Sequence, residues 1–164
     1  MPDNVVPLKQ LPAQIKHVNV HVTEGFGQVL DALAMVLDGT GGTQNLINGR
    51  GIALRRAVGF FNTRHPHVQA PIDLKFQNGV KLIKSKYSLV HGSKDERSKK
   101  TPINQSDKGS IAGFCYRFHV SDRNQAYRIL LCIFLGVQND LDLATIECDE
   151  ALLDLFASIR AAVT

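Results

Sequence analysis

The chain has 164 residues, of which 44% are hydrophobic and 21% are charged, and its formal net charge is +4. A chain of this length and composition can bury a core of ordinary size without metals or disulfides, so we expect a single domain over residues 1–164. The longest apolar run, from Ile129 to Leu135, is far too short to cross a bilayer, which argues against a transmembrane protein.

The N-terminal residues and the cysteines indicate the cellular compartment in which the protein is expected. The first residues, MPDNVVPLKQLPAQ, contain neither a basic leader nor an apolar core, so we expect no secretory signal peptide. Cys115, Cys132 and Cys148 are odd in number and widely spaced, which favours reduced thiols in or near the core. The sequence therefore predicts a cytoplasmic protein, and we expect no cofactor.

The first third of the chain predicts a strand and two helices. Residues 14–22 alternate between valines and polar side chains, which is typical of a half-buried strand. Thr23 can cap a helix that carries one apolar stripe and ends at Gly39. A second helix is expected from about Gly49 to Phe61, because apolar residues recur there at steps of three and four.

A β-hairpin is predicted for residues 72–90, IDLKFQNGVKLIKSKYSLV. Asn78-Gly79 supplies the two positive-φ positions of a type I′ turn. In that register apolar side chains share one face of the hairpin and lysines share the other. The next twenty residues, 91–110, are polar and basic, and we expect them to form a flexible loop.

The remaining segment predicts a strand followed by two helices. Residues 111–120 alternate and indicate a further half-buried strand. Ser121 or Asp122 can cap a buried helix that reaches Val137, although periodicity leaves a strand over 130–137 open. Residues 141–147 suggest a short edge strand, and a last helix begins near Asp149. The expected fold class is α+β: a mostly antiparallel sheet packed against about four helices.

Charge is distributed unevenly along the chain. The net charge is −2 over residues 1–48, +11 over 49–128 and −5 over 129–164. A basic middle segment indicates a cationic surface for an anionic partner such as nucleic acid, another polyanion or an anionic membrane. The candidate polyanion-binding residues are those of the predicted hairpin, the loop and the second helix: Lys75, Lys81, Lys84, Lys86, Lys94, Arg97, Lys99, Lys100, Lys108, Arg55 and Arg56.

These cations favour a binding protein over an enzyme. No aromatic side chain is expected among them to stack on bases, so contact with the phosphate backbone of DNA or RNA is favoured over base readout. We expect the loop 91–110 to become ordered on contact. An alternative from the structural class is a self-assembling coat- or matrix-like protein, in which the basic middle of one copy meets the acidic C-terminal region of another.

A second alternative is a metal-dependent nuclease. His65 and His67, if extended, stand roughly 6.6 Å apart on one side and could share a divalent ion with a third ligand. This pair resembles the His-hydrophobic-His signature of single-strand nucleases with a tyrosine nucleophile, and the resemblance implies that Tyr127 would be the nucleophile. The sequence departs from that family because Pro66 lies between the histidines and Leu131 stands four residues after the tyrosine.

Overall fold

The computed structural model describes residues 15–38, 46–92 and 97–164, and over these ranges the α+β class is confirmed. The described part contains six α-helices and one two-stranded antiparallel sheet. In chain order the elements are β1 (Ile15–Val22), α2 (Glu24–Asp38), α3 (Leu46–Arg64), α4 (Leu74–Ser85), η2 (Tyr87–Leu89), β2 (Arg97–Asn104), α5 (Gln105–Phe118), α6 (Arg123–Val137), η3 (Leu143–Thr145) and α7 (Glu150–Val163).

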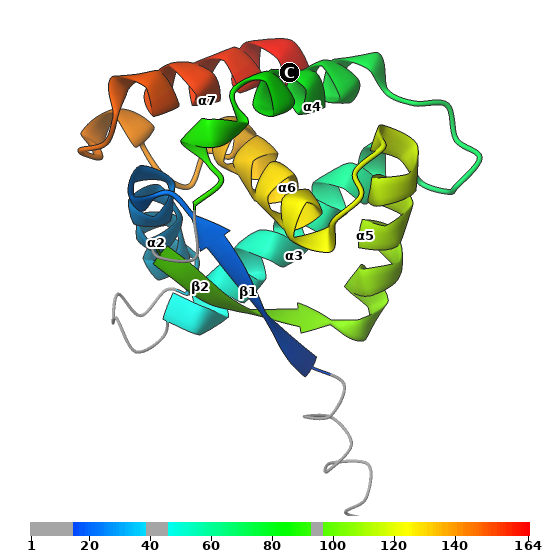
Figure 1. The fold of residues 1–164 in the computed structure, drawn as a ribbon, viewed down its shortest axis with the longest axis horizontal. Helices are drawn as coiled ribbons and strands as arrows, with labels where there is room; N and C mark the ends of the chain where they lie inside the picture. Colours follow the sequence, from blue (N-terminus) through cyan, green and yellow to red (C-terminus); the bar gives the residue numbers. More distant parts are fainter. Residues whose placement is uncertain (1–14, 39–45, 93–96) are drawn as a thin grey trace, which may run out of the picture.

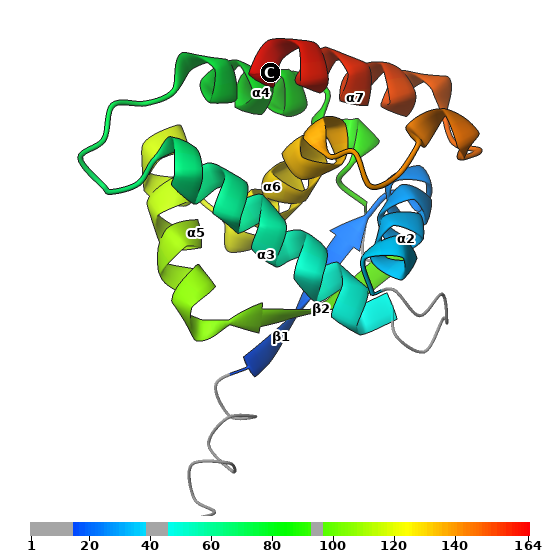
Figure 2. The ribbon, with the colours of Figure 1, turned by 180° about the vertical axis from the view of Figure 1, so that it is seen from behind.

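Helix α6 lies at the centre, with α4 and α7 side by side on one end of the molecule and the sheet at the other (Figure 1). Helix α3 crosses the back, where it packs against both α6 and β2, and α5 stands beside it (Figure 2). From Ala126 to Gly136 every residue of α6 is buried. The open alternative of a strand over 130–137 is thus resolved in favour of the helix.

The predicted N-terminal strand is confirmed as β1, but its partner lies inside the segment expected to be a flexible loop. β1 pairs with β2 in a register that sets Val18 opposite Thr101 and Val20 opposite Lys99. The loop prediction for 91–110 is therefore wrong for β2 and for the start of α5, while residues 93–96 lie outside the described part. The sequence pattern did not predict this strand, because its inward-facing positions include a lysine and a threonine.

The predicted Asn-Gly hairpin over 72–90 is also wrong, because this segment forms α4 and η2. The Asp73 carboxylate accepts a hydrogen bond from the Phe76 N–H at 3.0 Å and so caps the helix. Gly79 is a helical residue at a close contact with α7, where an added Cβ would lie 2.6 Å from Cγ2 of Val163. The glycine is thus explained by packing and not by a turn.

The strand predicted over 111–120 is helical as well. α5 buries Ile111, Phe114 and Phe118, which are spaced by three and four, and it ends at His119 in a left-handed conformation with φ 55°. In the predicted strand Tyr116 would share the apolar face with Phe114 and Phe118, but it is 85% exposed. The edge strand expected over 141–147 is wrong too, since that segment contains the 3₁₀ turn η3.

The remaining helices are confirmed with small shifts of their ends. α2 begins after Thr23, whose hydroxyl accepts from the Phe26 N–H at 3.3 Å, and α3 is longer at both ends than expected. α7 begins after Asp149 as expected. The described part thus has six helices where about four were expected. Its sheet has two strands, β1 and β2, and contains neither the predicted hairpin nor the strand predicted over 111–120.

Candidate polyanion-binding surface

Four of the predicted cations gather on one exposed helix. Lys75, Lys81 and Lys84 belong to α4, Lys86 is its C-cap, and all four side chains are exposed. We call these four residues the α4 lysine face; Lys75 reaches toward the end of α7 and Lys84 toward the end of α5, so the four are spread over the exposed half of the helix. They were expected on a hairpin, and the structure places them together on a helix instead, whose opposite side is buried in the core through Phe76, Gly79, Val80 and Ile83.

The composition of α4 makes this helix strongly cationic. From Leu74 to Ser85 it contains no acidic residue. Lys84 donates to the carbonyl of Phe118 at 2.7 Å, at the C-terminal end of α5, and Lys75 donates to the carbonyl of Thr164 at 3.4 Å. The Phe118 carbonyl is a neutral peptide group, so it positions the Lys84 ammonium group without cancelling its charge. Among the described residues, the Asp154 carboxylate of α7 lines a groove together with Lys86.

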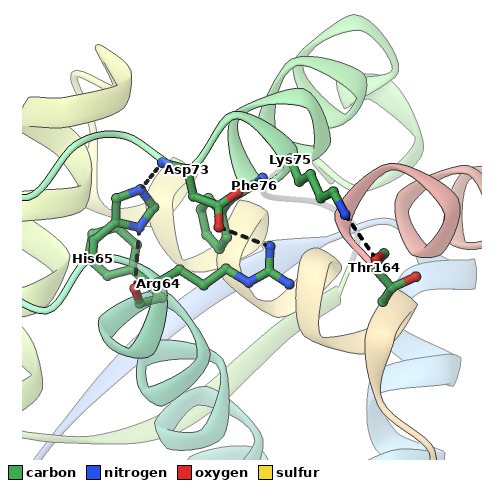
Figure 3. Close-up of polar contacts among 7 residues, drawn as sticks. Arg64, His65, Asp73, Lys75, Phe76 and Thr164 are labelled. Carbon is green, nitrogen blue, oxygen red and sulfur yellow. Dashed lines mark hydrogen bonds and ion pairs between the residues drawn. The ribbon is translucent and has the colours of Figure 1, made fainter.

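Asp73, at the start of α4, already binds neighbouring groups of the protein (Figure 3). Asp73 caps the helix and pairs with Arg64 at 3.3 Å, and the Arg64 guanidinium also lies over the ring of Phe60. Burial alone would raise the pKa of Asp73, but the hydrogen bond from Phe76 and the charge of Arg64 outweigh it and lower this pKa below its usual value. Asp73 is therefore a structural group.

Lys99 and Arg56 do not join this surface, because each is held in an ion pair. The Lys99 ammonium is buried and pairs with Asp31 of α2, which also pairs with Arg50. Arg56 donates to Asp140 at 2.8 Å at the surface. These ion pairs join different elements of the fold, so Lys99 and Arg56 are better explained as structural residues than as part of a free cationic surface.

The other predicted cations are scattered or undescribed. Lys100 is exposed on the outer side of the sheet, and Arg55 and Lys108 lie on α3 and α5. Arg97 belongs to β2, where its backbone pairs with that of Val22, and Lys94 lies outside the described residues. The structure therefore divides the predicted set and concentrates only the α4 lysine face.

The geometry gives the nuclease alternative no support. His65 is buried, its Nε2 accepts from the Asp73 N–H at 3.1 Å, and its Nδ1 lies 3.3 Å from the carbonyl oxygen of Phe61 (Figure 3). The Nε2 lone pair is thus occupied by the Asp73 N–H, and Nδ1 carries the proton that is donated to the Phe61 carbonyl, so neither ring nitrogen is open to a metal. Tyr127 is buried as well, and burial raises the pKa of its hydroxyl. Within the described ranges no three His, Cys, Asp or Glu residues form a group that could hold a metal.

Sequence reasoning missed the contacts that fix the connection between α3 and α4. Arg117 of α5 donates to the carbonyls of Ala70 at 2.8 Å and His67 at 2.6 Å, which ties this connection to α5. The capping role of Asp73 was readable in principle, since an aspartate directly before an apolar helical stripe is an N-cap signal. The Arg117 contacts have no local signal, because they join residues about fifty positions apart.

Among the described helices none is long and apolar enough to span a membrane. Comparison of the chain with family models, with curated proteins and with solved structures found no match.

Proposed function

We propose that this protein is a non-enzymatic binding protein that engages nucleic acid or another polyanion through the α4 lysine face. The single observation that carries the proposal is a group of four exposed lysines, three on α4 and one at its C-cap, on a helix that has no acidic residue between Leu74 and Ser85. Lysines that neutralise phosphates release condensed counterions, which drives binding without any reading of sequence. The face itself exposes no aromatic side chain, which favours contact with the phosphate backbone.

A cytoplasmic location is part of this proposal. It is supported by three free cysteines, of which Cys132 is fully buried and Cys115 and Cys148 are half-buried. Free thiols of this kind persist in reducing compartments.

The test is fluorescence anisotropy of labelled single-stranded DNA, double-stranded DNA and RNA over a series of salt concentrations. The variant Lys75→Gln/Lys81→Gln/Lys86→Gln removes three charges and keeps Lys84, which bonds to α5. We expect weaker binding, with a slope of log affinity against log salt that is smaller by about 2 to 3. The matched control, Lys16→Gln/Lys100→Gln/Lys108→Gln, removes the same charge outside α4 and should keep most of the affinity.

Equal losses in the two triple variants would mean that net charge, and not the α4 lysine face, determines binding, and this proposal would fail. Parallel reactions with Mg²⁺ or Mn²⁺ test the nuclease alternative, which requires strand cleavage that depends on the metal.

Self-assembly is the second candidate function. The observation that favours it is charge complementarity: the acidic residues of the 140–154 segment are exposed and could meet the α4 lysine face of another copy. Light scattering separates the two candidates. Assemblies that form at low salt without nucleic acid and dissociate at high salt support self-assembly, while a monomer at all salt concentrations contradicts it.

A further inference from the structure

A groove lies between α3, the end of β2 and the start of α5, three elements whose arrangement can be followed in Figure 2. It has a volume of about 330 Å³. Its apolar lining comes from Gly51, Ile52, Leu54 and Pro102. Gly51 and Pro102 are in close contact, because an added Cβ at position 51 would lie 2.5 Å from Cγ of Pro102. The groove is thus an opening above a tightly packed junction of three elements.

Four polar side chains complete the lining: Asn48, Arg55, Asn104 and Asp107. Asn104 is the N-cap residue of α5, yet its side chain makes no capping hydrogen bond. Burial raises the pKa of the Asp107 carboxyl above its usual value, and the nearby charge of Arg55 offsets this only in part. The groove therefore combines two amides, a carboxyl and a guanidinium next to an apolar wall.

This set of groups matches a planar, polar-edged ligand. Each amide can donate and accept, as the edge of a nucleobase does, and a carboxylate accepts from an exocyclic amino group. The apolar wall can cover the face of a ring, and Arg55 can bind an adjoining phosphate. A free phosphate would fit poorly, because the Asp107 carboxylate repels it and the apolar wall offers it no hydrogen-bond donor.

We propose that this groove binds one amino-bearing base of a single-stranded nucleic acid, with Asn48 and Asn104 on the base edge and Arg55 on the neighbouring phosphate. The inference rests on the proposed function, and it adds a base contact at the junction of α3, β2 and α5, which is separate from the α4 lysine face. It also implies a preference: cytosine and adenine should bind better than thymine, which has no exocyclic amino group for Asp107.

The test compares three probes: a labelled decamer of dC, a labelled decamer of dT, and inorganic polyphosphate of similar charge as a competitor. The variant Asn48→Ala/Asn104→Ala should lose about threefold to tenfold in affinity for the dC decamer, the effect of losing one or two hydrogen bonds. Its affinity for polyphosphate and its melting temperature should not change. The matched control, Asn62→Ala/Asn139→Ala, removes two exposed amides elsewhere and should bind like the native chain.

The outcomes separate this inference from the proposed function. Polyanion binding that depends on the α4 lysine face, with equal affinity for dC and dT and no effect of Asn48→Ala/Asn104→Ala, overturns the groove and leaves the proposed function standing. If the native chain binds no polyanion, the proposed function fails, and the uncharged nucleoside deoxycytidine is then titrated by NMR. Amide shifts confined to the groove would uphold base binding there, and their absence would overturn it.

Discussion

One carboxylate links α2, α3 and β2. Asp31 of α2 pairs with Arg50 of α3 through Oδ1, at 2.9 Å from Nη2 and 3.0 Å from Nε, and with the Lys99 ammonium of β2 through Oδ2. The side chain of Lys99 is 4% exposed, that of Arg50 11% and that of Asp31 17%. Asp31→Asn keeps the shape of this side chain and removes its charge, so two cations remain close together and shielded from water.

The expected cost follows from this burial. Breaking a fully buried ion pair by removing one partner costs about 3–5 kcal/mol. Because Asp31 keeps some contact with water and asparagine still accepts a hydrogen bond, we expect a loss of about 2–4 kcal/mol in the free energy of unfolding. With a urea dependence of about 2 kcal/mol per molar, the unfolding midpoint should fall by roughly 1–2 M.

The assay is urea unfolding followed by circular dichroism, with Asp140→Asn as the matched control. Asp140 pairs with Arg56 at 2.8 Å, but these side chains are 44% and 47% exposed. Exposed pairs contribute about 0–1 kcal/mol, so the control should move the midpoint by less than about 0.5 M. If the two variants lose the same stability, burial does not govern these pairs, and the structural role given to Lys99 is refuted.

The remaining predictions concern His65 and two glycines. Burial lowers the pKa of His65 below 6.5, with Arg117 and Arg64 acting in the same direction and the Phe61 carbonyl and Asp73 opposing them. The unfolded chain therefore binds this proton more readily, and stability should fall as the pH drops below 6.5. His65→Gln should flatten the dependence of the urea midpoint on pH, and an unchanged slope would contradict this reading. Gly136→Ala should lower the melting temperature by overpacking worth about 1–3 kcal/mol, because its Cβ would lie 2.8 Å from Ile159 Cγ2. Gly109→Ala, with open space around its Cβ in α5, should raise the melting temperature by stabilising the chain by about 0.5–1 kcal/mol, and a lower value would contradict the exposed helical position.

Three of the helices that the sequence predicted, α2, α6 and α7, have an N-cap signal at Thr23, Asp122 and Asp149. α2 and α7 then carry apolar residues at helical spacing, and α6 continues as an almost wholly apolar segment that is buried on all sides. In these segments the local signals agree with the tertiary contacts, so local reasoning is sufficient.

The errors fall where local signals conflict with contacts distant in sequence. Asn78-Gly79 is the strongest short hairpin signal, but the glycine allows the close approach of Val163 of α7. Lys99 marks its segment as polar, but Asp31, 68 positions earlier, lets it point inward from β2. No inspection of residues 72–104 alone could supply either partner, and this is why the sheet was predicted too large and in the wrong place.

The four lysines of the α4 lysine face are exposed, as the hairpin prediction also had them, although they lie on a helix, and the reason is physical. An amphipathic segment divides its side chains between core and water in either secondary structure, and lysines take the water side in both. The buried positions of α4 are Phe76, Gly79, Val80 and Ile83, and none of them is basic. Membership of the basic segment 49–128, by contrast, does not show which cations are available to a partner. Arg50 and Lys99 belong to this segment, yet both are paired with Asp31. A cationic surface therefore follows from lysines that lack acidic partners and not from net charge, and α4 is the described helix that meets this condition with the most lysines.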